Sequence, residues 1–158
     1  MNARLRALTL TTAAAISAAL LASPALASVS WGPLTSYYNG TSRSSSHGTF
    51  DNVSGVSASV HAWLNDTAND GNTVYTDADF YFYEYDGATC GGAGTCFVYD
   101  RTKNSKEYTY SNTPTTFYLQ DPLHSAATQA RASIYTCVQL GWPVPDSCSP
   151  RAIATFSY

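Results

Sequence analysis

Three tyrosines alternate along one segment of the chain, at Tyr81, Tyr83 and Tyr85. Residues two apart in an extended strand point to the same face, so the three phenol rings would share one side. Such rings stack on sugar rings and hydrogen-bond through their hydroxyls, with a large contact area at low entropic cost. The tyrosines are therefore a candidate ligand-binding surface. The alternatives are a tyrosine-rich outer sheet face without a ligand, or one covered by the amino-terminal arm.

Tryptophan supplies a second candidate for ligand binding. Trp142 lies in the Gly- and Pro-rich segment Gly141–Cys148, where an exposed loop side chain would be placed for recognition. The alternative is that Trp142, like Trp31 and Trp63, caps the open end of a hydrophobic core.

Carboxylates at Asp77, Asp79 and Glu84 raise the question of acid–base chemistry. Asp77 and Asp79 would lie about 7 Å apart on one strand face, and glycosidases need such a carboxylate pair. Any strand with the pattern D-x-D has this spacing, however. The chain has no Gly-x-Ser-x-Gly nucleophile motif, and oxidised cysteines would not serve as nucleophiles. The sequence predicts a protein that is not an enzyme.

The acidic segment 65–79 partly resembles an oxygen-rich calcium loop, with Asp66 and Asp70 as the first carboxylates. The third loop position is Ala68, and the closing ligand would be the short Asp77 in place of a glutamate. No flanking helices are predicted. A solvated turn is therefore expected here, with no metal and no cofactor.

The first 27 residues have the form of an export signal. Arg4 and Arg6 precede a largely apolar stretch, and Ala25-Leu26-Ala27 has the small-x-small form that signal peptidase accepts. After residue 27, no apolar run approaches the ~18 residues that a membrane helix requires. The sequence predicts a cleaved signal peptide over 1–27 and a single secreted domain over 28–158. The compact, alanine-rich signal is typical of bacteria.

The charge balance excludes some partners. The chain carries 8 Lys+Arg and 11 Asp+Glu, so its net charge is −3, and loss of the two signal arginines would make it −5. An acidic protein lacks the basic footprint that nucleic acid requires, and an anionic membrane surface is disfavoured for the same reason. Only 12% of the residues are charged, which suits a neutral, hydroxyl-rich ligand.

All four cysteines follow the predicted signal. In an oxidising compartment, two disulfides are expected, and four cysteines allow three pairings. The local pairing Cys90–Cys96 and Cys137–Cys148 is favoured, because each pair flanks a turn-rich segment between strand-like runs.

Alternation of apolar and polar side chains predicts about seven to eight short strands and no amphipathic helix. The clearest strands are 56–64, 74–85, 129–140 and 151–158. A loop is expected over 39–48 and a polar turn over 102–106. This pattern predicts an all-β, antiparallel β-sandwich stapled by two disulfides, with a small barrel as the alternative.

These features lead us to expect a non-enzymatic extracellular module that binds a polysaccharide or a cell-surface glycan. The rival is a secreted protein-interaction module, inhibitor-like or similar to a toxin or bacteriocin. Its contacts would be the stapled loops Cys90–Cys96 and Gly141–Cys148. A structural surface protein is the third hypothesis.

Overall fold

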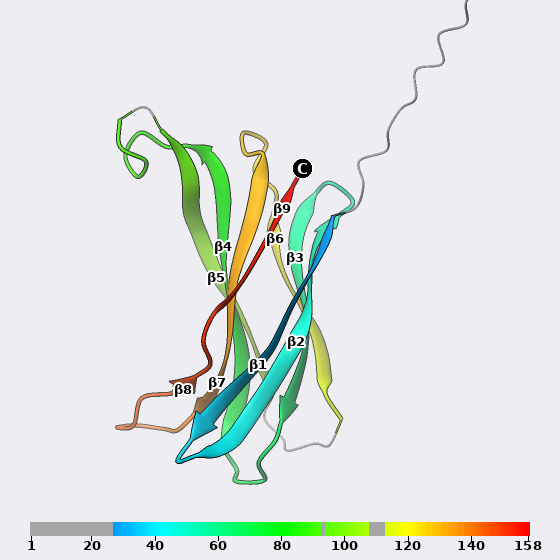
Figure 1. The fold of residues 1–158 in the computed structure, drawn as a ribbon, viewed down its shortest axis with the longest axis vertical. Helices are drawn as coiled ribbons and strands as arrows, with labels where there is room; N and C mark the ends of the chain where they lie inside the picture. Colours follow the sequence, from blue (N-terminus) through cyan, green and yellow to red (C-terminus); the bar gives the residue numbers. More distant parts are fainter. Residues whose placement is uncertain (1–26, 93, 108–112) are drawn as a thin grey trace, which may run out of the picture.

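The computed structural model describes residues 27–92, 94–107 and 113–158, which form two antiparallel sheets packed face to face (Figure 1). The nine strands of this described part are β1 (Ser28–Tyr38), β2 (Thr41–Val53), β3 (Ser57–Asp66), β4 (Thr73–Tyr85), β5 (Thr95–Glu107), β6 (Thr115–Pro122), β7 (Gln129–Gln139), β8 (Ser147–Cys148) and β9 (Ala152–Ser157). The predicted all-β sandwich is confirmed. The predicted signal peptide lies outside the described residues except for Ala27.

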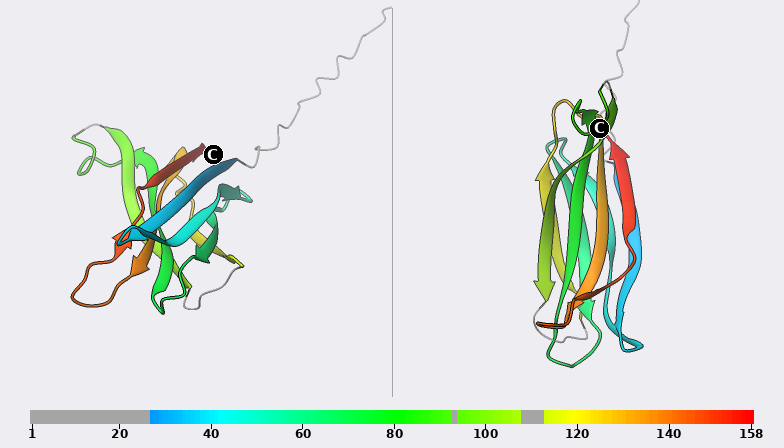
Figure 2. Two further views of the ribbon diagram at one scale, coloured as in Figure 1. Left: turned by 60° about the horizontal axis from the view of Figure 1, so that its bottom comes forward. Right: turned by 90° about the vertical axis from the view of Figure 1, so that its left-hand side faces the viewer.

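The two sheets pack face to face, so each has one inner and one outer face. The first sheet has the order β1-β2-β3-β6, and the second has the order β5-β4-β7, with β8 and β9 both pairing with β7. After the β1–β3 meander the chain crosses to the second sheet for the β4–β5 hairpin. It then returns for β6 and crosses again for β7. Figure 2 shows the two layers from two further directions.

The core lies between the sheets and follows the alternation of the strands. Ala78, Phe80 and Phe82 of β4 are fully buried, as their shared face predicts. Phe50 of the first sheet meets Phe80 and Phe156 of the second, at ring-centroid distances of 6.1 and 4.7 Å. The tyrosines that alternate with these residues are therefore directed to the outer face of the second sheet.

A serine-rich segment forms a full strand where the sequence predicts a loop. Of the loop predicted over 39–48, only the Asn39-Gly40 turn is present, and the prediction is wrong from Thr41, where β2 begins. The Oγ of Ser44 points inward and lies 2.6 Å from Ser36 Oγ and 3.2 Å from Thr136 Oγ1 of the other sheet. Short hydroxyl side chains thus satisfy one another inside the sandwich, so a strand with few apolar residues is tolerated there.

Strand β5 is also longer than the sequence predicts. The expected turn over 102–106 is part of β5, which pairs with β4 from Thr95 to Glu107. A polar segment can continue as an edge strand because water satisfies its outward-facing groups. Of the short strand predicted at 107–110, residues 108–110 lie outside the described residues.

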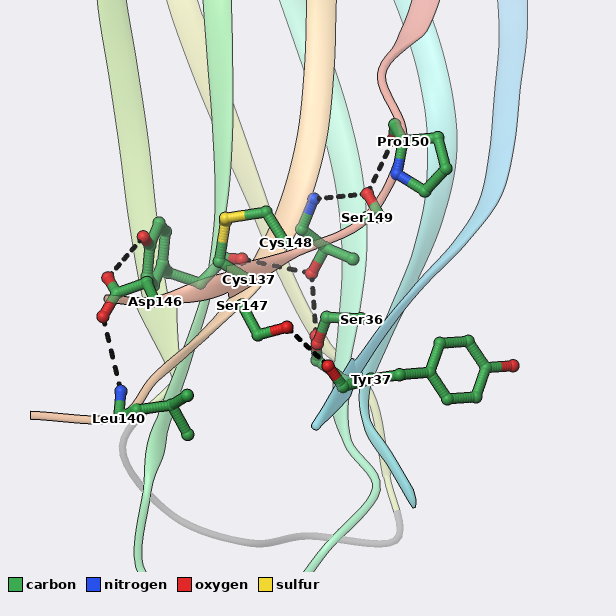
Figure 3. Close-up of a disulfide and its surroundings, with 12 residues drawn as sticks. Ser36, Tyr37, Cys137, Leu140, Asp146, Ser147, Cys148, Ser149 and Pro150 are labelled. Carbon is green, nitrogen blue, oxygen red and sulfur yellow. Dashed lines mark hydrogen bonds between the residues drawn. A yellow bond between two sulfur atoms is a disulfide. The ribbon is translucent and has the colours of Figure 1, made fainter. Parts of the chain in front are cut away.

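Both predicted disulfides are present. Cys90–Cys96 closes the tip of the β4–β5 hairpin, and Cys137–Cys148 joins directly paired residues of β7 and β8 (Figure 3). In the second bond Cys137 is fully buried and Cys148 is exposed, whereas Cys90 and Cys96 are both half-buried.

Removal of the two disulfides is expected to have unequal effects on stability. In the chain-entropy account, Cys137→Ala with Cys148→Ala lowers the free energy of unfolding by about 3 kcal/mol, and Cys90→Ala with Cys96→Ala by about 2 kcal/mol. The reason is that the bonds close segments of 11 and 6 residues, respectively. Denaturant titration of both double variants measures the difference. A larger loss for the hairpin-tip bond would contradict this account.

Candidate functional site

Four aromatic side chains form a surface on the outer side of β4 and β5, which we call the tyrosine face: Tyr81, Tyr83, Phe97 and Tyr99. The strand register places Tyr81 opposite Tyr99 and Tyr83 opposite Phe97. The ring centroids of these pairs are 5.6 and 5.1 Å apart, in edge-to-face contact. Tyr99 is 52% exposed, and the other three are half-buried. The rings thus support one another and still reach solvent.

A guanidinium group borders the tyrosine face. Arg131 of β7 lies opposite Tyr81 in the sheet. Its Cζ is 3.5 Å from the centroid of the Phe97 ring, and its Nε donates to Thr155 Oγ1 at 3.4 Å. A cation over a ring is electrostatically favourable, so Arg131 is held beside the rings. Strand β1 belongs to the other sheet, so the amino-terminal strand does not cover this face.

The carboxylates of the D-x-D pattern are engaged with neighbouring groups. Asp79 forms an ion pair with Arg151 and accepts a hydrogen bond from Thr102 Oγ1 at 2.6 Å. Arg151 in turn lies over the Tyr135 ring, with its Cζ 4.3 Å from the ring centroid. Burial, together with the charge of Asp77, raises the pKa of Tyr135 to about 12. The structure therefore gives Asp77 and Asp79 different partners on the outer face.

Tyr85 and Trp142 lie at opposite ends of the second sheet. Tyr85 is 67% exposed and extends the tyrosine face toward the hairpin tip. Trp142 follows the other end of the sheet, where Gln139 pairs with Thr73. The eight residue-to-residue steps from Thr73 to Tyr81 span about 26 Å. The structure thus brings the three tyrosines together and places Trp142 elsewhere.

The loop that carries Trp142 is anchored on both sides. Asp146 accepts hydrogen bonds from the backbone N of Leu140 at 3.3 Å and from the Tyr75 hydroxyl at 2.7 Å, and Cys148 follows two residues later (Figure 3). Burial and the hydrogen bond to Asp146 both raise the pKa of Tyr75. The Trp142 side chain itself is 97% exposed, so it does not cap the core.

A second row of rings, the His–Trp ladder, crosses the outer face of the first sheet. It consists of His47 of β2, His61 and Trp63 of β3, and Tyr118 of β6. Ring centroids are 5.5 Å apart for His47 and Trp63, 3.9 Å for His61 and Trp63, and 4.2 Å for His61 and Tyr118. This row was not predicted from the sequence. The available signal was that both β3 rings fall on the polar side of the alternation, but pairing across three strands cannot be read from one segment.

A charged cluster lies where β5 and β6, one from each sheet, come together. Asp121 is fully buried, and its carboxylate lies 3.0 Å from the Nε of Arg101. Burial, together with the hydrogen bond that the protonated Asp121 donates to the Asp100 carboxylate, raises the pKa of Asp121 to about 6, while the same hydrogen bond lowers the pKa of Asp100. The Nδ1 of His124 lies 3.2 Å from the Glu84 carboxylate. The sequence does not reveal this cluster, because its members come from four separate segments.

The acidic loop after β3 is closed by its own backbone. Asp66 accepts a hydrogen bond from the N–H of Ala68 at 3.0 Å, and Asp70 accepts one from the N–H of Asn72 at 2.9 Å. Burial by itself would raise the pKa of Asp70. The hydrogen bonds from Asn72 and the charge of Arg43 outweigh this effect, so the pKa lies below its usual value. These are turn-stabilising contacts. Across the described residues, no group of three or more His, Cys, Asp or Glu side chains is placed to hold a metal ion.

Comparison of the chain with protein families, curated proteins and solved structures finds no match. In the described part of the chain, no helix is long and apolar enough to cross a membrane. The two disulfides are compatible with an extracellular protein. A function can therefore be proposed only from the geometry of the described side chains.

Proposed function

We propose that this protein is a secreted glycan-binding module that holds a neutral polysaccharide against the tyrosine face. The observation that carries the proposal is the pairing of Tyr81 with Tyr99 and of Tyr83 with Phe97 on the outer face of a sheet. Paired rings are held in fixed orientations by their neighbours, so little conformational entropy is lost when a ligand binds. The apolar faces of sugar rings match such a surface.

The polar groups around the rings can hydrogen-bond a neutral ligand. Asp79 and Arg151 neutralise each other, and Arg131 is stacked on Phe97. Hydroxyl groups also border the rings, since Tyr99 Oη and Thr102 Oγ1 lie 3.0 Å apart. A ligand that offers many hydroxyls and no charge would satisfy these groups.

The experiment that tests the proposal is a pull-down of the purified protein on insoluble cellulose, chitin, starch and bacterial cell walls. We expect depletion of the protein from solution by at least one of these polymers, with little dependence on salt because the ligand is neutral. Tyr37→Ala is the matched control, since Tyr37 is a 58% exposed tyrosine on the other sheet. Binding to none of the four materials would contradict the proposal.

The exposure of Trp142 favours one second candidate function, a protein-interaction module that acts through the loop Gly141–Cys148. An indole that is 97% exposed on an anchored loop is typical of a contact residue for a partner protein. The other stapled loop, Cys90–Cys96, lies at the opposite end of the second sheet (Figure 1). A single compact partner would therefore engage one loop and not both.

Trp142→Ala separates the two functions. The free energy of unfolding is expected to change by less than about 0.5 kcal/mol, because the side chain packs against little. Polymer binding through the tyrosine face should be unchanged in the same variant. Thermal unfolding and the pull-down measure both quantities. Loss of polymer binding on this single substitution would instead move the glycan site to the loop.

A further inference from the structure

A shallow pocket of about 550 Å³ opens on the outer face of the first sheet. The side chains that shape it come from β1, β2 and β3, and they are Ser30, Trp31, Pro33, His47, Thr49 and Trp63. Its volume lies within the range of about 300–1,000 Å³ that is usual for small-molecule sites. The pocket is on the sheet opposite to the tyrosine face, so the two surfaces share no residue.

Two glycines shape the pocket. Gly32 has a φ of +82°, which favours glycine, and the pairing of β1 with β2 shifts register between Trp31 and Leu34. A Cβ on Gly48 would lie 1.9 Å from the His61 carbonyl oxygen and 2.9 Å from the Cζ2 of Trp31, so glycine is needed where the β3 backbone and the indole approach. Trp31 is 5% exposed, and its Nε1 donates to the Thr49 carbonyl at 3.0 Å. The indole of Trp31 therefore lines the pocket and also belongs to the hydrophobic core.

The rest of the lining is aromatic or hydroxylated. Trp63 stacks against His47, with ring planes 10° apart, and both rings border the pocket. Ser30 is exposed at its rim. The Thr49 hydroxyl donates to Asp51 at 2.6 Å, which leaves its oxygen able to accept a hydrogen bond. None of the residues around the described pocket is Asp, Glu, Lys or Arg, so the lining favours an uncharged ligand.

We propose that this pocket is a second sugar site, which takes one neutral sugar ring packed against Trp63 and His47. The Ser30 and Thr49 hydroxyls and the His47 imidazole are its hydrogen-bond partners. The inference rests on the proposed function, since it takes sugar as the ligand class of both surfaces.

The positions of the two sites have a consequence for how the protein acts on glycans. The two sheets are separate layers (Figure 2). Because the pocket and the tyrosine face lie on the outer faces of opposite sheets, they point away from each other. One straight segment of polymer cannot contact both. The protein therefore bridges two glycan chains.

Tryptophan fluorescence tests the pocket directly. The chain has three tryptophans, and Trp142→Phe removes the exposed one, so both remaining indoles, Trp31 and Trp63, line the pocket. We expect cellobiose, N,N′-diacetylchitobiose or maltose to change the emission of this variant. Trp63→Ala in the same background should weaken that binding at least about tenfold. Trp63 lies on the outer face, so its loss opens no core cavity.

Two further variants show whether the emission change comes from the pocket and not from the tyrosine face. The sugar-dependent emission change should persist when Tyr81→Ala and Tyr83→Ala are added, and it should vanish with Ser30→Tyr, which fills the rim. Failure of the proposed function would appear as lost polymer binding with this emission change intact. No emission change with any of the three sugars at tens of millimolar, or a change that survives Ser30→Tyr and Trp63→Ala, would overturn the pocket proposal.

A retention experiment tests whether the protein bridges two glycan chains. Wild-type protein bound to its insoluble polymer should retain a fluorescently labelled soluble fragment of that polymer, and the Trp63→Ala variant should bind the polymer but release the fragment. Equal retention by the two proteins would overturn the bridging inference.

Discussion

Replacement of both Tyr81 and Tyr83 by alanine is expected to weaken polysaccharide binding about 100-fold. Each ring would supply about 1.4 kcal/mol of contact with a sugar, and each 1.4 kcal/mol is a factor of ten in affinity. The two residues sit at the centre of the tyrosine face, in contact with Tyr99 and Phe97, respectively. Depletion isotherms on the polymer identified by the pull-down measure the change.

The fold should tolerate this double substitution. Neither ring belongs to the hydrophobic core, and a cross-strand pair on a sheet surface contributes roughly 0.2–1 kcal/mol to stability. Thermal unfolding should therefore remain cooperative with a modestly lower midpoint. Tyr37→Ala is again the matched control, because Tyr37 is 58% exposed on the opposite sheet. Wild-type affinity in the double variant would remove the tyrosine face from the account.

Asp121→Asn is expected to stabilise the protein near neutral pH by about 2 kcal/mol. Asp121 is fully buried beside Asp100 and Arg101, and its pKa is raised to about 6 from an ordinary value of 3.8. The folded state then binds more protons than the unfolded state between about pH 4 and pH 6, so stability falls as the pH rises through this window. An asparagine amide can donate to Asp100 as the protonated acid does, without the charge.

The pH profile distinguishes this effect from a general gain in stability. Asp121→Asn should stabilise little near about pH 4 and most above about pH 6. Asp86→Asn provides the contrast, because hydrogen bonds from Thr89 and Ala88 lower the pKa of Asp86, so this substitution should not stabilise at neutral pH. Denaturant titrations across the pH range measure both variants. A loss of stability in Asp121→Asn at about pH 7 would show that the carboxylate is held there as a favourable ion pair.

The sequence predicted the features that depend on local alternation. The inner face of Ala78, Phe80 and Phe82, the outward tyrosines, the β4–β5 hairpin and both disulfides follow from a period of two and from cysteines placed around turns. The prediction failed at β2, where Ser44 is buried by hydroxyl partners from two other strands. Its serine-rich composition is typical of a loop. The hydroxyl partners that allow a strand there are distant in the sequence, so the composition does not reveal them.

The candidate sites likewise divide into residues that one strand predicts and residues that only the strand pairing brings together. Tyr81 and Tyr83 were recognisable because they share one strand, but Phe97, Tyr99 and Arg131 join them only through the strand register. The His–Trp ladder and the cluster around Asp121 combine residues from three or more segments. Such groups require the strand order, which the alternation pattern does not specify.

The most direct test of glycan binding at the tyrosine face is a nuclear magnetic resonance titration of the isotope-labelled protein. The ligand is a soluble oligosaccharide of the polymer that the protein binds. The Trp63→Ala variant is used, so that the pocket on the other sheet does not contribute. We predict that the largest shift changes fall on Tyr81, Tyr83, Phe97 and Tyr99, with Arg131 beside them. Saturable binding whose shift changes are confined to other residues, such as those of the Trp142 loop, would contradict the account.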